Sequence, residues 1–300
     1  MNALATPALR RLLDVPAPAK LNLFLHVTGQ RPDGYHLLQS VFMLIDWCDA
    51  LHFEIRADGL VTREDISGIA LPANDLCVRA AHALKTATGC PLGVHIGLEK
   101  RLPSEAGLGG GSSDAATCLL ALNRLWGLGL TRPQLAAIAL PLGADVPFFI
   151  GGQTAWVEGI GEKLTPVSLG EARFVVVKPP GGASTQQIFR SLQLKRDTET
   201  AILQGFAANE SAGTLKLDLQ KILDFGHNDL QPVAQDLCPD VGLCIDWLQR
   251  HDLSGRMTGS GTAVFAHVRH SPALTDAPGT WTVQVCSNMD SHPLFGWCRD

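Results

Sequence analysis

The chain has 300 residues, of which 46% are hydrophobic and 18% charged, and its formal net charge is −5. This length and composition exclude a largely disordered protein and predict either one large domain or two smaller ones. The acidic balance, without a basic stripe, argues against a nucleic-acid partner, although backbone dipoles let an acidic protein bind a small anion.

The sequence carries no signal for secretion or for a membrane. Its N-terminal part has no apolar run of signal-peptide length, and no segment approaches the ~20 apolar residues of a membrane helix. None of the eight cysteines forms a C-x-x-C pair, so neither a zinc cluster nor a disulfide framework is predicted. We therefore expect a cytoplasmic protein without a membrane partner, whose cysteines are mostly small buried side chains.

The strands are predicted from alternating and short apolar segments. Residues 1–16 precede them and predict a poorly ordered or weakly helical leader that ends in VPAPA. Residues 20–28 then alternate as a strand does, with Lys20 and Asn22 on one face and leucines on the other. Further strands are predicted at 51–57, 93–99, 173–178, 263–268 and 280–287.

Three helices are predicted before residue 142. The first runs from Asn74, a candidate N-cap, to Gly89, which suits the left-handed position after a helix. The third begins at a capping-box pattern, Thr131 with Gln134, and ends near Pro141. The second lies between them and has an apolar stripe made of Ala115, Cys118, Leu119, Leu122, Leu125 and Trp126.

The remaining segments have weaker patterns. Residues 143–152, GADVPFFIGG, contain a proline and paired glycines and predict a loop. From 190 to about 228 the pattern indicates polar helical segments without clear boundaries. A break near 155–165 favours a division of the chain into two domains.

Four glycines stand directly before the second helix, in the segment GLGGGSSDAA over residues 107–116. Glycine is costly to order, so turn geometry or the close approach of a ligand must require it here. The segment is either a tight turn with a serine cap or a cradle whose free N–H groups bind phosphate oxygens. It lacks the lysine of a Walker A loop, the glycine spacing of a dinucleotide loop and the last glycine of a nucleophile elbow.

Four motifs follow one another along the chain: PAKLNLFL with RPDGYH, GLGGGSSDAA, GADVPFF and RMTGSGTAVFA. Together they make the sequence resemble the GHMP kinase superfamily, and RPDGYH is typical of its members that act on a cytidine-linked sugar alcohol. The resemblance implies an α+β fold with a ribosomal protein S5 domain 2-like domain over 1–158, a ferredoxin-like domain over 159–300, and an active site between them.

The activity that the resemblance implies is phosphorylation of the 2-hydroxyl of 4-diphosphocytidyl-2-C-methyl-D-erythritol, in the non-mevalonate route to isoprenoid precursors. ATP would be the co-substrate and Mg²⁺ the cofactor. Ser113 and Asp114 are possible oxygen donors for the metal, whose ligands stay unassigned. The partners would be these small molecules, and the protein would be a monomer or a weak homodimer.

The resemblance also assigns roles to residues. Asp145 would act on the substrate hydroxyl, as a base or as a positioning group, and Lys20 would keep its carboxylate ionised. The substrate would be bound by Asn22, Tyr35, His36 and Phe189, with the two aromatic rings stacking on cytosine and His36 bonding its edge. ATP would be bound by Pro103, Ser104, Glu105, Ala106, Gly107, Leu108, Gly109, Gly110, Gly111, Ser112 and Ser113.

Other interpretations of the same residues stay open. Asp145 also suits an Asx turn, and Lys20 an ordinary strand end. A homoserine or mevalonate kinase is the alternative enzyme, but neither has a cytidine on which Tyr35, the single tyrosine, would stack. A nucleotide-binding regulator without catalysis is the alternative from another class, and the presence of both Lys20 and Asp145 argues against it.

Overall fold

The computed structural model describes residues 9–68, 71–209, 214–270, 272 and 274–300. Within these residues the larger of two sheets has eight strands, ordered β3-β4-β2-β5-β6-β9-β8, with β1 paired to β2 beside this path. The strands are β1 (Arg11–Gln30), β2 (His36–Arg56), β3 (Val61–Asp65), β4 (Gly93–Glu99), β5 (Ala155–Glu158), β6 (Lys163–Ser168), β8 (Ala207–Asn209) and β9 (Leu215–Leu217).

The long antiparallel hairpin β1–β2 begins earlier than the sequence predicts. Residues 11–16 belong to β1, so the prediction of a weakly helical or unordered leader is wrong there, while residues 1–8 lie outside the described part. The prolines are tolerated because, among the described strands, this part of β1 pairs with β2 alone, and its register shifts between Pro18 and Ala19. Val15 and Ala17 are buried in the core, and this burial favours the strand.

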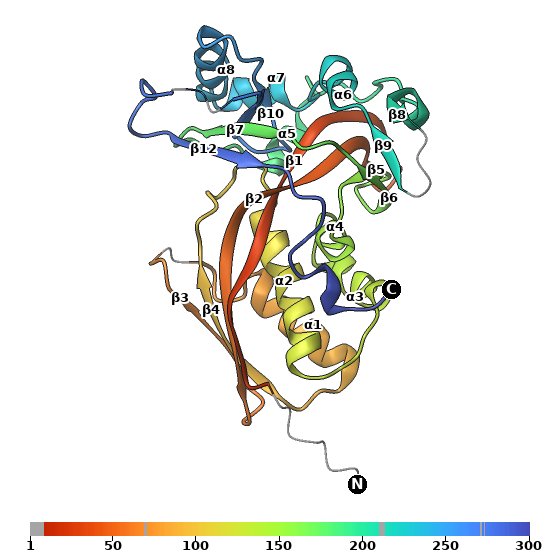
Figure 1. The fold of residues 1–300 in the computed structure, drawn as a ribbon, viewed down its shortest axis with the longest axis vertical. Helices are drawn as coiled ribbons and strands as arrows, with labels where there is room; N and C mark the ends of the chain where they lie inside the picture. Colours follow the sequence, from red (N-terminus) through yellow and green to blue (C-terminus); the bar gives the residue numbers. More distant parts are fainter. Residues whose placement is uncertain (1–8, 69–70, 210–213, 271, 273) are drawn as a thin grey trace.

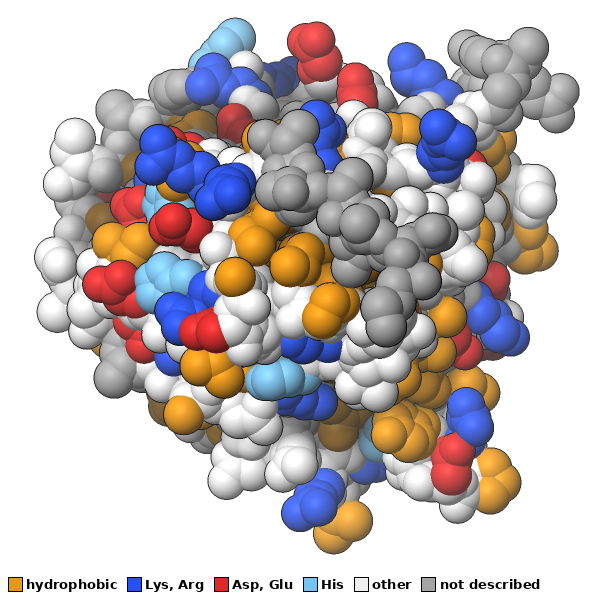
Figure 2. Space-filling model, turned by 90° about the horizontal axis from the view of Figure 1, so that it is seen from below, with side chains coloured by type: hydrophobic (Ala, Val, Ile, Leu, Met, Phe, Trp, Pro, Cys, Tyr) orange, Lys and Arg blue, Asp and Glu red, His pale blue; other side chains and the backbone are white. Residues whose placement is uncertain are grey.

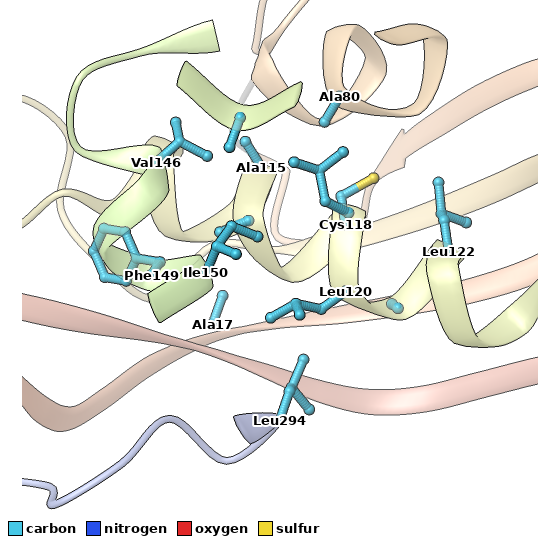
Figure 3. Packing of buried hydrophobic residues seen from close by; sticks show 14 of the residues in the cluster. Ala17, Ala80, Ala115, Cys118, Leu120, Leu122, Val146, Phe149, Ile150 and Leu294 are labelled. Carbon is cyan, nitrogen blue, oxygen red and sulfur yellow. The ribbon is translucent and has the colours of Figure 1, made fainter. Parts of the chain in front are cut away.

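Four helices pack on one face of the larger sheet (Figure 1). Figure 3 shows side chains of α2 meeting those of α1 and α4. The predicted apolar stripe of α2 is confirmed, since all its members are buried. The four helices are α1 (Leu76–Thr88), α2 (Gly110–Leu125), α3 (Arg132–Ala139) and α4 (Val146–Gly151), with a short 3-10 turn, η1 (Leu140–Leu142), after α3.

The ends of these helices correct the predictions in two places. The N-cap of α1 is Asp75, whose carboxylate accepts a hydrogen bond from the Val78 amide at 3.0 Å, and not Asn74. The predicted loop 143–152 contains α4, because Pro147 lies in the first helical turn, where no N–H is needed. The predicted left-handed Gly89 and the capping box at the start of α3 are confirmed.

The second sheet is antiparallel, with the order β10-β11-β7-β12, and α7 and α8 lie above it in Figure 1. The predicted strand 173–178 is β7, and the two later strands begin slightly after their predicted starts. The stretch 190–228 contains α6, but also β8 and β9, which the prediction of polar helices missed. The elements are β7 (Arg173–Lys178), β10 (Arg256–Met257), β11 (Val264–Val268), β12 (Thr282–Ser287), α5 (Thr185–Arg190), α6 (Leu219–Phe225), α7 (Gln231–Leu237), α8 (Asp240–Arg250), η2 (Leu203–Phe206) and η3 (Phe295–Trp297).

The chain passes between the two parts of the molecule several times, and the α+β class is confirmed. The β5–β6 hairpin, in which Glu158 lies opposite Lys163, spans the predicted domain boundary at 158/159, and this boundary stays a prediction. The C-terminal segment returns to the N-terminal half, where Leu294 packs in the core beside α2 and α4 (Figure 3). Strand β1 contributes to all three buried hydrophobic clusters of the described residues.

The surface charges, the cysteines and the lengths of the helices bear on the remaining predictions. Figure 2 shows basic and acidic side chains interspersed on the face seen from below. All eight cysteines are free thiols and most of them are buried, as predicted. Among the described helices, none combines the length and the apolar character needed to cross a bilayer.

Candidate active site

A cavity of about 1360 Å³ brings together segments that are far apart in the sequence. Its wall is formed by β1, the turn before β2, the glycine loop before α2, the segment before α4, both ends of α5 and the loop 259–261. Every predicted site residue lines it except Ser113, which is fully buried inside α2. Asp75, the N-cap of α1, also lines the cavity, whereas Asn74 does not.

Lys20 and Asp145 form an ion pair in this cavity, with 3.6 Å between Nζ and Oδ2. The lysine side chain is 4% exposed and the aspartate side chain 33%. Burial lowers the pKa of Lys20, and the charge of Asp145 opposes this shift. The carboxylate accepts no backbone hydrogen bond within the described residues, which weighs against the Asx-turn interpretation. It is therefore free to meet a ligand from the solvent side.

Asn22 orients the lysine from the next inward position of β1. Its side-chain oxygen accepts a hydrogen bond from Lys20 Nζ, and its Nδ2 donates to Ser40 Oγ at 3.2 Å. Its backbone N–H donates to Thr258 Oγ1 at 2.8 Å. Since one hydrogen of Nδ2 is left for a ligand, Asn22 both positions Lys20 and presents a donor to the cavity.

The glycine loop ends at the N-terminus of α2. Gly109 is the N-cap in the left-handed conformation, and no side chain caps the helix. The first amides of α2 therefore have no intrahelical acceptor, and Gly110 and Gly111 line the cavity. Glu105 also has a left-handed φ of 52°. The backbone thus has the shape of an anion cradle.

The TGSG segment (residues 258–261) and the two residues after it pack backbone to backbone against this loop. Amides of Thr262 and Ala263 donate to the carbonyl oxygens of Glu105 and Ala106, each at 3.2 Å. A Cβ at Gly261 would lie 1.8 Å from the nitrogen of Gly107, so only glycine fits at this contact.

Replacing Gly261 by alanine should therefore push the two loops apart. We expect the free energy of unfolding to fall by about 1–3 kcal/mol and the affinity for ATP to fall with it. Thermal unfolding and calorimetric ATP titration measure the two effects. Gly279→Ala is the control, because a Cβ there meets nothing within 4 Å. Unchanged ATP affinity in Gly261→Ala would contradict the coupling between the loops.

A buried charge cluster lies behind the glycine loop. Lys100 Nζ contacts the carboxylates of Asp49 and Asp114, the second at 2.8 Å. Asp49 also accepts hydrogen bonds from the amides of Arg101 and Leu102 at 2.6 and 2.8 Å, and thereby fixes the chain that enters the loop. Neither Asp49 nor Lys100 stands in a recognisable motif, so the sequence alone does not indicate them.

The cluster makes stability depend on pH. Burial, followed by the charge of Asp49, raises the pKa of Asp114 to about 7, against the opposing effect of Lys100. Between about pH 4 and pH 7 the folded protein thus binds a proton that the unfolded chain releases, so this group's contribution to stability falls as pH rises. We expect Asp114→Asn to gain stability relative to wild type by up to about 1 kcal/mol per pH unit over this range. Urea unfolding from pH 5 to 8 measures it, and parallel curves would contradict it.

The other end of the cavity holds the aromatic residues predicted for cytosine. The rings of His36 and Phe189 lie 4.9 Å apart at 34° between their planes. Tyr35 is 60% exposed at the end of the turn 31–35. Arg196 also lines this end and was missed, since it lies in the stretch where the sequence pattern is weakest.

Two family models and several curated relatives match this chain. Residues 75–153 match the GHMP kinases N terminal domain, and residues 211–275 match the GHMP kinases C terminal family. A 4-diphosphocytidyl-2-C-methyl-D-erythritol kinase from Polaromonas sp. (strain JS666) is 62% identical over 96% of this chain and 95% of its own. The kinase of the same name from Acidovorax sp. (strain JS42) is 60% identical over 96% of this chain and 99% of its own.

Solved structures of kinases also resemble this chain in their fold. A 4-(cytidine 5'-diphospho)-2C-methyl-D-erythritol kinase superposes with a TM-score of 0.68 at 33% identity, covering 86% of this chain and 90% of its own. The homoserine kinase from Cytophaga hutchinsonii, at 15% identity, a TM-score of 0.67 and coverage of 97% and 98%, shares the fold alone. The chain therefore belongs to the GHMP kinases and, within them, to the family of the 4-diphosphocytidyl-2-C-methyl-D-erythritol kinases.

Proposed function

We propose that this protein transfers the γ-phosphoryl group of ATP to the 2-hydroxyl of 4-diphosphocytidyl-2-C-methyl-D-erythritol. The observation that carries the proposal is a single cavity with three parts: an anion cradle, the Lys20–Asp145 pair and an aromatic end. The names of the relatives described above supply the substrate, and a place in isoprenoid precursor synthesis is part of the proposal.

The residues divide the work of phosphoryl transfer. The amides at the start of α2 bind the phosphate oxygens of ATP. Asp145 accepts or holds the proton of the hydroxyl, whose oxygen bonds to the γ-phosphorus while the bond to the bridging oxygen of ADP breaks. The buried ammonium of Lys20 lies beside this carboxylate and offsets the charge that moves with the phosphoryl group.

Mg²⁺ is the cofactor that such a transfer uses, and the residues fit a metal carried mainly by ATP. The described residues hold no group of three or more His, Cys, Asp or Glu side chains placed for a metal ion. Asp114 lines the cavity and its Oδ1 is a buried oxygen without a hydrogen-bond partner, whereas Ser113 lies outside the cavity wall. Phosphate oxygens and water would complete the shell, and the ion would neutralise phosphate charge.

The test is an ADP-release assay with MgATP and four acceptor conditions: the cytidine substrate, homoserine, mevalonate and no acceptor. Turnover with the cytidine compound alone is the expected result. Turnover with another acceptor would support the kinase activity and contradict the proposed substrate. ATP binding without any turnover would favour a regulator that has lost catalysis.

Tyr35→Ala tests the aromatic end by itself. Loss of one base-stacking ring costs about 1–3 kcal/mol, so we expect KM for the cytidine substrate to rise roughly 5- to 150-fold. KM for ATP should stay unchanged, because Tyr35 is on the turn before β2 and is not part of the glycine loop that binds the phosphates. Leu243→Ala, at an exposed position of α8, is the control. An equal rise of both KM values would argue against stacking.

We further propose a cytoplasmic enzyme that is a monomer or a weak homodimer and whose partners are its small-molecule substrates. The eight free thiols support a reducing compartment. Light scattering coupled to size-exclusion chromatography, at several protein concentrations, measures the oligomeric state.

A further inference from the structure

Arg196 connects the two sides of the aromatic end. Its Nε donates a hydrogen bond to Nε2 of His36 at 3.0 Å. Its two terminal nitrogens donate to the backbone oxygens of Leu194, Phe189 and Ser191, at 2.9, 3.0 and 2.8 Å. One guanidinium therefore ties the start of β2 to the end of α5 and to the segment that follows it.

The chemistry of this contact fixes the proton on the imidazole. A guanidinium has only donors and stays protonated, so Nε2 of His36 must accept with its lone pair. The ring is then neutral and carries its single proton on Nδ1. Burial and the charge of Arg196 both lower the pKa of His36, in keeping with a neutral ring. Within the described residues, Nδ1 makes no hydrogen bond, and His36 lines the cavity.

We propose that Arg196 is a positioning residue that sets substrate specificity: it holds His36 in the Nδ1–H tautomer, so that the site presents a fixed N–H donor to the pyrimidine. This inference rests on the proposed function, because it takes the aromatic end to be the site of the base. Since the same guanidinium binds the backbone of Phe189, it also fixes the stacking ring relative to this donor.

A fixed donor distinguishes two pyrimidines of almost equal shape. The ring edge of cytosine offers two acceptors, N3 and O2, whereas N3 of uracil carries a hydrogen. Nδ1–H facing N3 makes a hydrogen bond with cytosine and places two donors against each other with uracil. A histidine that could exchange tautomers would accept from uracil N3–H and lose this selectivity. Arg196 thus excludes the uridine compound that deamination of the substrate would produce.

The first experiment compares kcat/KM for the cytidine substrate with kcat/KM for its deaminated uridine analogue. In Arg196→Met we expect the preference for cytidine to fall roughly 10- to 100-fold, through loss of the fixed donor. Arg250→Met, at an exposed position of α8, is the control and should keep the wild-type preference. Arg196→Lys should keep part of the preference, since an ammonium also has only donors. An equal loss on both substrates in Arg196→Met would mean a merely structural role and would overturn the proposal.

The second experiment does not require turnover. In ¹⁵N spectra of the ligand-free wild-type protein, His36 should show a protonated Nδ1 and an unprotonated Nε2 from pH 6 to 8. The signals are assigned by their loss in His36→Gln. An Nε2–H tautomer or an imidazolium would overturn the proposal, whatever the assay shows. If the tautomer is found but no cytidine substrate turns over, the proposed function fails and the Arg196–His36 geometry stands.

Discussion

Replacing Asp145 by asparagine should lower kcat by about 10²- to 10⁴-fold and leave the affinity for ATP within a few-fold of wild type. The amide cannot take the hydroxyl proton, but it is nearly isosteric with the carboxylate. Because the Asp145 side chain is one-third exposed (33%), the substitution should have little effect on folding. Lys20 would lose its counter-charge, which opposes the lowering of its pKa by burial. Phosphate binding depends on the amides of α2 and should survive.

ADP release gives kcat, and calorimetry gives the affinity for ATP. Asp58→Asn, which breaks a surface pair with Arg56, is the matched control and should leave both values unchanged. A loss of only about ten-fold would identify Asp145 as a group that positions the hydroxyl and not as its base. Turnover close to wild type would remove Asp145 from the reaction altogether.

At pH 8, above the pKa of Asp114, replacing Lys100 by methionine should destabilise the protein by about 3–5 kcal/mol, because it leaves two buried carboxylates without their cation. The side chains of Asp49 and Asp114 are 0% and 4% exposed, so water cannot replace the ammonium. The amide contacts of Asp49 hold the chain just before the glycine loop. We therefore expect the affinity for ATP to fall as well.

Urea unfolding measures this loss, and a double variant identifies its cause. Lys100→Met combined with Asp114→Asn removes one of the stranded charges and should recover part of the stability, with a coupling of 0.5 kcal/mol or more. Lys163→Met, at an exposed position of β6, is the control for removing a lysine. A loss below about 1 kcal/mol in Lys100→Met would mean that the cluster is hydrated or protonated in the native protein.

Features that depend only on neighbouring residues can be predicted from the sequence. The capping box before α3, the left-handed Gly89 and the apolar stripe of α2 are local, and each follows from the conformation or periodicity of a short segment. The order of the glycine motifs along the chain was enough to indicate the superfamily. The same resemblance predicted Lys20 and Asp145 in one site, because their two motifs both belong to the superfamily's active site.

Features that depend on burial against distant segments can be seen only in the tertiary structure. Residues 11–16 and α4 contain prolines that predict no regular structure, yet core burial of Val15 and Phe148 favours the strand and the helix, and Pro147 stands in the first helical turn, where no N–H is needed. Both faces of β1 are buried, so the alternation of Lys20 and Asn22 with leucines marks cavity against core and not solvent against core. The conformational propensities of a short segment do not include the free energy of burial against distant residues.

The same limit explains the residues that the sequence analysis missed in and behind the cavity. Lys100 is held by carboxylates that lie 51 and 14 positions away in the sequence, and Arg196 by an imidazole 160 positions away. A single basic residue in a polar segment most often lies in solvent, and no periodic pattern distinguishes one that is buried among acceptors. Folding brings those acceptors together, and the desolvation of a charge then makes its partners obligatory. The sequence thus indicates many of the local elements and the chemistry of the glycine loops, whereas folding brings together the charges that face each other.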